Sequence, residues 1–422
     1  MIATIGPSHI RGSLRIPPSK STMQRACALG FLNNGITIIR NAGKSKDEQA
    51  AIEIIKQLGA SVKKDSEGNI IIKSTGIISA NKEISCGESG LSLRMFTPIV
   101  ALGNETVVLT GTGSLLSRPV GFFNTVLPEL QVSVQSNNGR LPLQVTGPLI
   151  PANITIDGSG SSQFLTGLLF AFSKAVSNVT TIKVNELKSK PYIDLSLQML
   201  EHFGYQVEND NYTNFKIFGT ENKIREVVFA NEGDWSAGAF LLVAGIISGD
   251  IVIDGLSKDS LQADRSIIEV LEKCGAEIVF EEDKLKVKHT KDLKAFTFDA
   301  TDCPDLFPPL VVLASFCNGI STIKGTSRLH DKESNREESL INVFSEMGIE
   351  IRVTGDVMII PGKKIIGGTV DGHHDHRIVM ACAVAALGSE KNIIIKGAEA
   401  VAKSYPDFFE DLQLLGASVS LR

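Results

Sequence analysis

A pattern of about 70 residues recurs six times along this 422-residue chain and restricts its fold more than any other feature. Each copy reads as an amphipathic helix, a glycine, a short strand, a polar turn and a second strand. With the second copy degenerate and the last one truncated, the copies lie at 54–74, 127–147, 200–219, 271–289, 344–362 and 412–422. Their spacing of 68–75 residues predicts a chain of repeated mixed α/β units.

The first copy shows how one unit folds. Within 48–58 the apolar side chains follow helical spacing and form one buried stripe: Ala51, Ile52, Ile55 and Leu58. Gly59 suits the end of that helix, because glycine adopts the left-handed backbone that often terminates helices. The sequence SEGN at 66–69 then predicts a hairpin turn. The equivalent positions in the other copies are near Glu129 and at Gly204, Gly275, Gly348 and Gly416.

The two ends of the chain complement each other. The last copy stops after its first strand, whereas the chain opens with strand-like residues, Leu14–Ile16, before any helix. We therefore expect the N-terminal segment to complete the final unit and to tie both chain ends into one domain. The length alone allows two or three domains of ordinary size.

A second set of segments repeats with the same period. Each is a polar or Gly/Pro-rich turn that runs into an apolar helical pattern, which is typical of a helix N-terminus. These segments are 17–25, 86–94, 157–165, 232–240, 302–310 and 373–380. If the units pack around approximate threefold axes, the helix starts of each domain converge on one side. Unpaired N–H groups and positive partial charge would make that side an anion site.

Positively charged residues accompany these turns. Four lie in the turns themselves and four in the loops between them: Lys20, Arg25, Arg94 and Arg377, then Arg118, Lys332, Arg336 and Lys403. For a single Lys or Arg a solvated surface position is the commoner explanation. Helix capping is the simple alternative for Ser161–Gln163 and for Asp305, as is a surface carboxylate for Glu333. The recurrence in phase favours a shared site for anions.

Composition and missing motifs exclude several classes of protein. The net charge of −5 argues against broad nucleic-acid binding but allows a small basic pocket. The apolar runs are too short to span a membrane, and no signal peptide is seen. GxxxxGK[ST] and GxGxxG motifs are absent. Six scattered cysteines indicate reduced thiols of a cytoplasmic protein: Cys27, Cys86, Cys274, Cys303, Cys317 and Cys382.

No metal or cofactor is expected. The histidines at 373, 374 and 376 share one turn, and neighbouring histidines in a turn rarely present a common coordination face. No cysteine or histidine array has zinc spacing.

The motifs taken in order resemble one enzyme family over residues 17–409. They are PPSKSxxxR, GxSGxSxR, RP, GSxSSQF, SKPYID, EGDWS, PD, KESxR, DHR and AKSYPDF. This set resembles the 3-phosphoshikimate 1-carboxyvinyltransferases, also called EPSP synthases. No single motif is specific, but their order is.

The resemblance implies an enzyme that transfers the enolpyruvyl group of phosphoenolpyruvate to the 5-hydroxyl of shikimate 3-phosphate and releases phosphate. It also implies an α/β fold of two domains, each with three βαβαββ units arranged as an inside-out barrel, which close over the substrates. By analogy the first domain joins residues 1–19 to 232–422, and the second spans 20–231. A cytoplasmic monomer is expected, without nucleic-acid or membrane partners.

The resemblance also assigns roles to individual residues. Shikimate 3-phosphate is expected to contact Lys20, Ser21, Arg25, Ser161, Ser162, Ser189, Asp305 and Lys332, with Tyr192 close by. Phosphoenolpyruvate is expected to contact Lys20, Gly90, Arg118, Gln163, Arg336, Arg377 and Lys403, with Arg94 supporting the Gly90 loop. Asp305 is the expected base toward the 5-hydroxyl, and Glu333 and Lys20 are both candidates for protonating the methylene carbon.

Three departures from the family pattern involve four positions. Leu91 and Met95 replace a usual threonine and a frequent proline, Asn335 replaces a usual aspartate, and Glu88 replaces a frequent asparagine. A leucine beside Gly90 is expected to move that backbone toward the phosphoenolpyruvate pocket. We therefore expect weakened binding of glyphosate, which occupies this pocket in the family.

Two other functions compete with this one. A UDP-N-acetylglucosamine enolpyruvyl transferase would carry Lys-Asn in the first motif and a loop cysteine near 110–120, whereas this chain has Lys20-Ser21 and no cysteine there. A ring-like binding module would need a basic inner face and would tolerate loss of Asp305 and Glu333.

Overall fold

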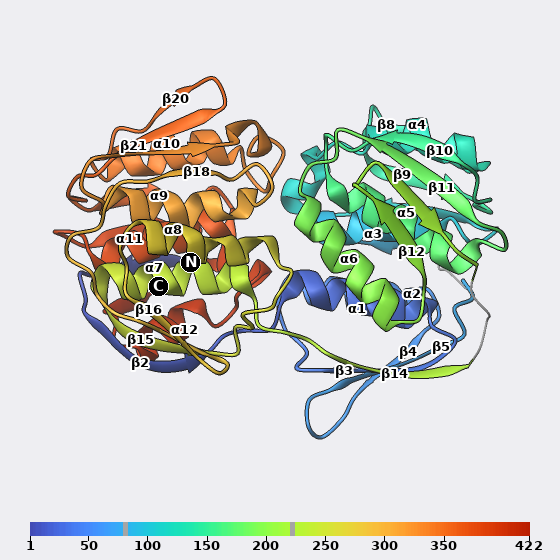
Figure 1. Cartoon of the computed structure of the whole chain (residues 1–422), viewed down its shortest axis with the longest axis horizontal. Helices are drawn as coiled ribbons and strands as arrows, with labels where there is room; N and C mark the ends of the chain where they lie inside the picture. Colours follow the sequence, from blue (N-terminus) through green and yellow to red (C-terminus); the bar gives the residue numbers. More distant parts are fainter. Residues whose placement is uncertain (79–82, 220–223) are drawn as a thin grey trace. The chain divides into compact units, whose positions relative to one another are not determined.

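The computed structural model describes residues 1–78, 83–219 and 224–422. The chain divides into two compact units (Figure 1). Unit 1 comprises Met1–Pro17 and Glu232–Arg422, and unit 2 comprises Pro18–Asn231. Each unit therefore has its own core, and one of them is assembled from both ends of the chain.

The described residues of unit 2 form three four-stranded sheets. Their strands are β14 (Arg225–Ala230), β3 (Gly35–Arg40), β5 (Ile70–Ser74) and β4 (Ser61–Lys64); β6 (Glu83–Ser85), β7 (Thr106–Thr110), β9 (Arg140–Thr146) and β8 (Ser133–Asn137); and β10 (Ile154–Asp157), β11 (Thr180–Asn185), β13 (Asn214–Ile217) and β12 (Val207–Asp210). The helices are α1 (Lys20–Leu32), α2 (Lys46–Gln57), α3 (Gly90–Val100), α4 (Gly121–Val126), α5 (Ser162–Ala175) and α6 (Lys190–His202), with 3-10 turns η1 (Gly113–Ser117) and η2 (Leu127–Leu130).

Unit 1 contains three more sheets of the same size. Their strands are β22 (Gly368–Asp371), β23 (Ile393–Lys396), β1 (Ile2–Ile5) and β24 (Val419–Leu421); β16 (Ile278–Glu281), β17 (Lys284–Val287), β15 (Gly249–Asp254) and β2 (Ile10–Arg15); and β18 (Thr297–Asp299), β19 (Ile320–Lys324), β21 (Val357–Pro361) and β20 (Arg352–Thr354). The helices are α7 (Trp235–Ser248), α8 (Ile267–Lys273), α9 (Phe307–Ser315), α10 (Arg336–Glu346), α11 (His376–Leu387) and α12 (Phe408–Leu414), with η3 (Ala263–Ser266), η4 (Pro304–Leu306), η5 (Thr326–Arg328) and η6 (Ala398–Lys403).

The six sheets that the described residues form share one topology, which confirms the sixfold repeat. In each, one outer strand runs parallel to its neighbour and the other two pairs are antiparallel, as in β10–β11–β13–β12 and β18–β19–β21–β20. In four of the six sheets a helix connects the two parallel strands and provides the crossover that such a pair needs, whereas β2 and β15, and β3 and β14, are parallel partners from distant parts of the chain. In five sheets the antiparallel hairpin follows the second helix, and in the sixth β24 pairs with β1 from the other end of the chain.

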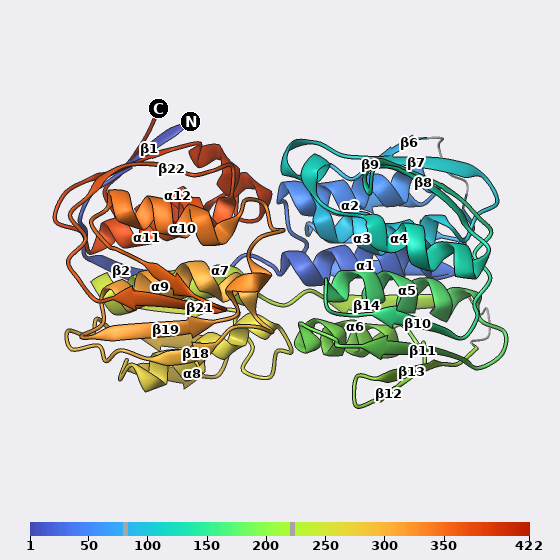
Figure 2. The ribbon, with the colours of Figure 1, turned by 90° about the horizontal axis from the view of Figure 1, so that it is seen from above.

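The helices lie inside and the sheets outside in each unit. Every residue of α3 and of α11 is buried, as is every residue of α7 except Ser236. The strands bury alternate residues, as β15 does, because one face packs on the helices and the other faces solvent. In unit 2, β10 to β13 lie on the outer side of α5 and α6 (Figure 2). The predicted α/β inside-out architecture is confirmed.

The start of the chain completes the final sheet, as predicted. β1 pairs antiparallel with β23 and with β24, the last strand of the chain. The strand proposed for this role was wrong, however. Residues Leu14 and Arg15 belong to β2, which runs parallel to β15 in another sheet of unit 1. A strand that pairs at long range cannot be assigned to a sheet from its local pattern.

The glycine markers have the backbone conformation that their position predicts. Gly59, Gly204, Gly275, Gly348 and Gly416 all have positive φ, between 78° and 109°. In the degenerate copy the same conformation falls on Gln131, with φ 64°. A residue in the left-handed conformation ends the second helix of every unit. Glycine adopts this conformation without the steric cost that a Cβ atom imposes. The hairpin predicted at 66–69 lies between β4 and β5.

No helix among residues 1–78, 83–219 and 224–422 combines the length and the hydrophobicity required to cross a membrane.

Candidate functional site

The six predicted helix starts are all present, and polar side chains cap most of them. Ser19, Ser89, Ser161, Asp234 and Asp375 accept hydrogen bonds from backbone N–H groups at the starts of α1, α3, α5, α7 and α11. Ser161 therefore caps α5, which was the simple alternative for this residue, and its predicted contact with phosphate stays a prediction. Asp305 in η4 makes no such bond and is used differently.

In unit 1 the carboxylate of Asp305 joins three segments that are far apart in sequence. Its Oδ1 lies 2.7 Å from Arg336 Nη1 and 3.5 Å from Lys332 Nζ, and its Oδ2 lies 3.0 Å from Arg377 Nη2. The starts of η4, α10 and α11 therefore converge, as the phase of the repeat predicted. The side chain of Asp305 remains 21% exposed, so a ligand can reach it.

These neighbours determine the protonation of Asp305. Burial by itself would raise the pKa of this carboxyl, but the charges of Arg377, Lys332 and Arg336 outweigh burial and hold the pKa well below its usual value. Asp305 is therefore ionised at neutral pH and can accept a proton or a hydrogen bond.

Arg336 is the centre of the charged cluster in unit 1. Its buried guanidinium, 1% exposed, donates to Asp375 Oδ2 (2.7 Å), Glu333 Oε2 (2.6 Å) and Asp305 Oδ1 (2.7 Å). Burial opposes its charge, yet the three carboxylates raise the pKa of Arg336 above its ordinary value. Arg336 begins α10 and does not lie in a loop, which corrects its predicted location.

Glu333 is not the surface carboxylate that the simple alternative supposed. It lies between two positive charges, 2.6 Å from Arg336 Nη2 and 3.9 Å from Lys403 Nζ, and its side chain is 10% exposed. Lys403, at the end of η6, is itself buried. Lys332, Glu333, Arg336, Arg377, Lys403 and Asp305 are thus brought together within unit 1.

Asp375 is a residue of the charged cluster that sequence reasoning did not single out. It is fully buried, accepts two hydrogen bonds from Arg336, and caps α11 by accepting from the N–H of Arg377 at 2.9 Å. It thereby fixes two guanidinium groups of the cluster. The sequence carried a signal for Asp375, because it occupies the same phase of the repeat as Asp234. An aspartate at a helix N-cap is common, however, so this position alone did not mark Asp375 as a partner of Arg336.

Asp264 is a second acidic residue that the sequence did not single out. It is buried in η3, its Oδ2 accepts from the hydroxyl of Ser236, and its Oδ1 has no hydrogen-bond partner within the described part of the chain. Burial first, and then repulsion from Asp305, raise the pKa of Asp264 to about 7, although Arg377 opposes this. A carboxyl near Asp305 therefore holds its proton into the neutral range.

Asp264 predicts a specific dependence of stability on pH. Unfolded, it ionises near its ordinary pKa of 3.8, whereas folded it keeps its proton to about pH 7. Between these values the folded state binds more protons, so the free energy of unfolding falls as pH rises, by up to about 1.4 kcal/mol per unit, and levels off above. Asp264→Asn removes this fall.

We therefore expect Asp264→Asn to gain stability relative to the unmodified protein as pH increases toward neutrality. Urea unfolding over this pH range measures the difference. Asp259→Asn, at an exposed position in the loop before η3, is the control and should track the unmodified protein. A difference that stays constant with pH would contradict the prediction.

In unit 2, Lys20 is the first residue of α1, and its Nζ lies 2.9 Å from Oδ2 of the buried Asp47 at the start of α2. The next turn of α1 is also tied to other helix starts. Gln24 Oε1 accepts from the hydroxyls of Ser89 and Ser92 at 2.6 and 2.9 Å. The starts of α1, α2 and α3 therefore lie together.

Arg25 is buried among backbone and hydroxyl oxygens. Its Nη1 donates to the carbonyl of Ser21 at 2.9 Å, its Nε donates to Ser196 Oγ at 2.9 Å, and its Nη2 contacts the carbonyl of Tyr192 at 3.4 Å. Burial lowers the pKa of Arg25 to about 10, with the phenol of Tyr192 opposing, which leaves the guanidinium charged at neutral pH.

The serines expected to bind phosphate come from two adjacent loops. β10 and β11 are parallel neighbours, and the loops that follow them are joined because the N–H of Lys188 donates to the carbonyl of Gly158 at 3.2 Å. Ser161 and Ser162 begin α5 from the first loop, and Ser189, with φ 56°, precedes α6 from the second. The hydroxyls of Ser161, Ser162 and Ser189 therefore share one edge of this sheet.

Gly90 lies directly against two guanidinium groups. A Cβ at Gly90 would be only 2.2 Å from Arg118 Nη1 and 3.3 Å from Arg94 Nη1, so no other residue fits there without a shift. Arg94 Nη1 donates to Gln163 Oε1 at 2.8 Å, and the Arg94 guanidinium lies 5.1 Å from the ring centroid of Phe164. The start of α3 thus meets the start of α5.

Each predicted substrate set draws on both units. Unit 2 supplies Lys20, Ser21, Arg25, Gly90, Arg118, Ser161, Ser162, Gln163 and Ser189, and unit 1 supplies Asp305, Lys332, Glu333, Arg336, Arg377 and Lys403. Within its own unit each group converges on helix starts. Most of the predicted positively charged site residues are buried, namely Arg25, Arg94, Arg118, Arg336, Arg377 and Lys403. The explanation as solvated surface charges is therefore wrong for these residues.

Cysteines and metal-ligating side chains are further groups from which a functional site can be built. All six cysteines are free and buried, and burial raises the pKa of several of them, including Cys86 and Cys382 to about 12. In the described part of the chain, no three or more His, Cys, Asp or Glu side chains are grouped to hold a metal ion.

Comparison with known proteins gives one consistent answer. Residues 5–412 match the family model described as EPSP synthase (3-phosphoshikimate 1-carboxyvinyltransferase). The chain is 37% identical to proteins named 3-phosphoshikimate 1-carboxyvinyltransferase from Clostridium novyi and from Clostridioides difficile, over 98% of this chain and 97% of each relative.

Solved structures share the fold. An EPSP synthase from Acinetobacter baumannii aligns with a TM-score of 0.84 and 26% identity over 100% of both chains. The enolpyruvyl transferase NikO from Streptomyces tendae aligns with a TM-score of 0.80 over 99% of this chain and 98% of that one, but at 18% identity it supports the fold alone.

Proposed function

Because the chain belongs to the EPSP synthase family, we propose that it transfers the enolpyruvyl group of phosphoenolpyruvate to the 5-hydroxyl of shikimate 3-phosphate. The products are 5-enolpyruvylshikimate 3-phosphate and phosphate, a step of aromatic amino-acid biosynthesis. The single observation that carries the roles of the residues is the Asp305 carboxylate, ionised and held by Arg336, Arg377 and Lys332.

Asp305 is the proposed base. The 5-hydroxyl adds to C2 of phosphoenolpyruvate while its proton passes to a carboxylate, and Asp305 is the partly exposed carboxylate of the unit 1 cluster. A carboxylate whose pKa is held low is a weak base on its own. Phosphoenolpyruvate carries a phosphate and a carboxylate that compete with Asp305 for Arg336 and Arg377. As these guanidinium groups turn to the substrate, the basicity of Asp305 rises.

The addition step also places a proton on the methylene carbon, and elimination removes one from the resulting methyl group as phosphate leaves. Glu333 and Lys20 are the proposed carriers of these protons. Glu333 lies between Arg336 and Lys403, and Lys20 is paired with Asp47, so each has a partner that stabilises its charged form. Both remain candidates for protonating the methylene carbon.

Binding of the two anions is assigned to the buried cations and the helix starts. Arg25, Lys332 and the hydroxyls of Ser161, Ser162 and Ser189 are proposed to hold shikimate 3-phosphate, together with Lys20, Ser21 and Asp305. Arg118, Gln163, Arg336, Arg377, Lys403, Lys20 and the Gly90 backbone are proposed to hold phosphoenolpyruvate. The close packing of Gly90 on Arg118 supports the second set, because it leaves backbone and guanidinium donors side by side.

Phosphate release tests the function. Purified protein should release phosphate when phosphoenolpyruvate and shikimate 3-phosphate are both present, but with neither alone. Replacing shikimate 3-phosphate by UDP-N-acetylglucosamine tests for the competing enolpyruvyl transferase activity on that substrate. No phosphate release is expected in this reaction. Absence of release above the single-substrate controls would reject the assignment.

The enzyme is further proposed to act in the cytoplasm as a monomer without nucleic-acid partners. The buried free thiols support the cytoplasmic location, and the net charge of −5 supports the lack of nucleic-acid partners. Light scattering in solution measures the mass, and a mass near twice 45.3 kDa would contradict the monomer.

Leu91 predicts reduced sensitivity to glyphosate. The side chain of Leu91 is buried, so its bulk influences the backbone of Gly90, which already lies at contact distance from Arg118. We expect Leu91→Thr to lower the inhibition constant for glyphosate by about tenfold, equivalent to about 1.4 kcal/mol. The KM for phosphoenolpyruvate serves as the control and should change less. Equal inhibition constants for the two proteins would refute this explanation.

A further inference from the structure

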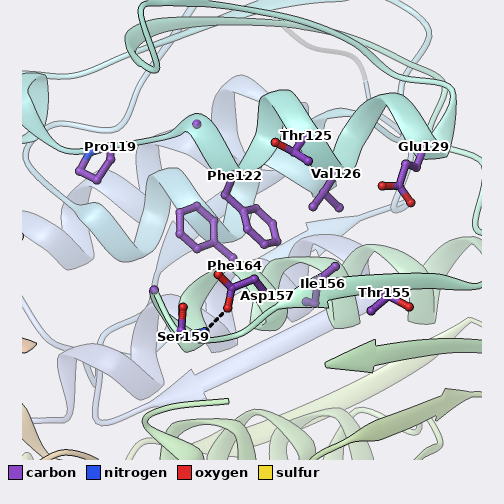
Figure 3. A pocket seen from close by; sticks show the side chains of 12 residues that line it. Pro119, Phe122, Thr125, Val126, Glu129, Thr155, Ile156, Asp157, Ser159 and Phe164 are labelled. Atoms are coloured by element: carbon purple, nitrogen blue, oxygen red, sulfur yellow. Dashed lines mark hydrogen bonds between the residues drawn. The ribbon is translucent and has the colours of Figure 1, made fainter. Parts of the chain in front are cut away.

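Unit 2 contains a pocket of about 400 Å³ that none of the proposed substrate residues lines. Its volume falls in the range of small-molecule sites. One wall comes from α4 and η2, and the other from β10 and the start of α5 (Figure 3). The lining residues used in the argument below are Phe122, Thr125, Glu129, Asp157 and Phe164.

The centre of the pocket is aromatic. The rings of Phe122 and Phe164 stack with centroids 4.3 Å apart and an interplanar angle of 21°. Figure 3 shows the two rings side by side at the pocket, and the side chains of Val126 and Ile156 extend its apolar lining. Such a surface accommodates a flat apolar group.

The charged side chains that line the pocket are both acidic, while the guanidinium of Arg94, which does not line it, contacts the ring of Phe164. Among the described residues that line the pocket, Asp157 and Glu129 are the charged ones, and both are exposed to solvent. Asp157 Oδ1 accepts from the N–H of Ser159 at 2.8 Å, a bond that lowers the pKa of this carboxyl and keeps it ionised. The second oxygen of Asp157 is directed toward the pocket region in Figure 3.

We infer that this pocket is a second ligand site, which takes a small cation carried on an apolar ring, such as an aromatic amidinium or amine. The ring packs on Phe122 and Phe164, and the cation pairs with Asp157. The substrates of the proposed function are anions, so the opposite charge preference separates this site from theirs.

The pocket is linked to the substrate residues through Phe164. This residue follows Gln163 in α5, and its ring lies against the guanidinium of Arg94, which donates to Gln163. A ligand that fixes the Phe164 ring therefore acts on the Arg94–Gln163 pair. This expectation rests on the proposed function: a ligand in the pocket should change the affinity for phosphoenolpyruvate by roughly fivefold. By thermodynamic linkage, bound phosphoenolpyruvate should change the affinity of the pocket for its ligand by the same factor.

Benzamidine and benzamide test the site, because they share a shape and differ in charge. By calorimetry, benzamidine should bind saturably in the millimolar range and benzamide about tenfold more weakly or not at all. Asp157→Asn keeps the acceptor for Ser159 and should weaken benzamidine to the level of benzamide. Glu129→Gln should have a smaller effect.

Thr125→Trp tests the location by filling the pocket from an exposed position of α4. It should abolish benzamidine binding while leaving phosphate release unchanged, which shows that the protein is folded. The inference is overturned if benzamidine does not bind, if benzamide binds equally, or if Thr125→Trp binds benzamidine normally. Equal phosphoenolpyruvate affinity with and without benzamidine would overturn the link. The benzamidine binding measurements do not depend on enzymatic turnover. Their outcome can therefore be interpreted even if the proposed function is wrong.

Discussion

Asp305→Asn should lower kcat for phosphate release by about 10²- to 10⁴-fold, the range expected when a general base is removed. Asparagine has the same shape and keeps an oxygen toward Arg336 Nη1, but it cannot take the proton of the 5-hydroxyl. It also carries no negative charge, so Arg336 and Arg377 lose a competitor of the substrate.

The substitution should therefore separate catalysis from binding. Calorimetry should show that Asp305→Asn binds phosphoenolpyruvate at least as tightly as the unmodified protein, while steady-state phosphate release gives the loss in kcat. Asp331→Asn is a matched control, since Asp331 is an exposed carboxylate next to Lys332, and it should keep normal rates. A loss in kcat below about tenfold would remove Asp305 from the role of base.

Asp375→Ala should destabilise unit 1 by about 3–5 kcal/mol, the cost of removing one partner from a buried ion pair. Asp375 accepts from Arg336 Nε at 2.7 Å and Nη2 at 3.3 Å, from Ser334 Oγ at 3.2 Å and from the N–H of Arg377 at 2.9 Å. Alanine leaves these donors without their acceptor and removes the N-cap of α11. Activity should fall as well, because Arg336 and Arg377 lose their orientation.

Urea unfolding followed by circular dichroism measures this effect, and the transition of unit 1 should move to lower urea. Asp371→Ala, at the end of β22, is the control, because the Asp371 side chain is exposed and accepts only from the N–H of His373 among the bonds described. Asp375→Asn should lie between the two, since it keeps an acceptor for the cap but loses the charge. An Asp375→Ala protein with an unchanged transition would show that Arg336 is compensated by its other carboxylates.

Much of the fold follows from local pattern. The repeat places the second helix of each unit, the left-handed residue that ends it, and the hairpin beyond, because each depends on residues within one or two turns of chain. Gly59 and Gly348 illustrate this, since a positive φ at a helix end requires only the glycine and its neighbours. The six helix starts are predicted for the same reason.

The sequence by itself therefore determined the repeated α/β units, the helix starts, and the set of charged residues that accompany them. Only the tertiary structure decided which of these charges meet. Arg336 binds Asp305 and Asp375, which lie 31 and 39 residues away, and the strand that completes the final sheet is Ile2–Ile5 and not Leu14–Ile16. The burial of Asp264 and the pocket beside Phe164 likewise appear only after packing. Periodicity reports the conformation of a segment, whereas ion pairs and sheet partners depend on contacts between segments that the local pattern does not encode.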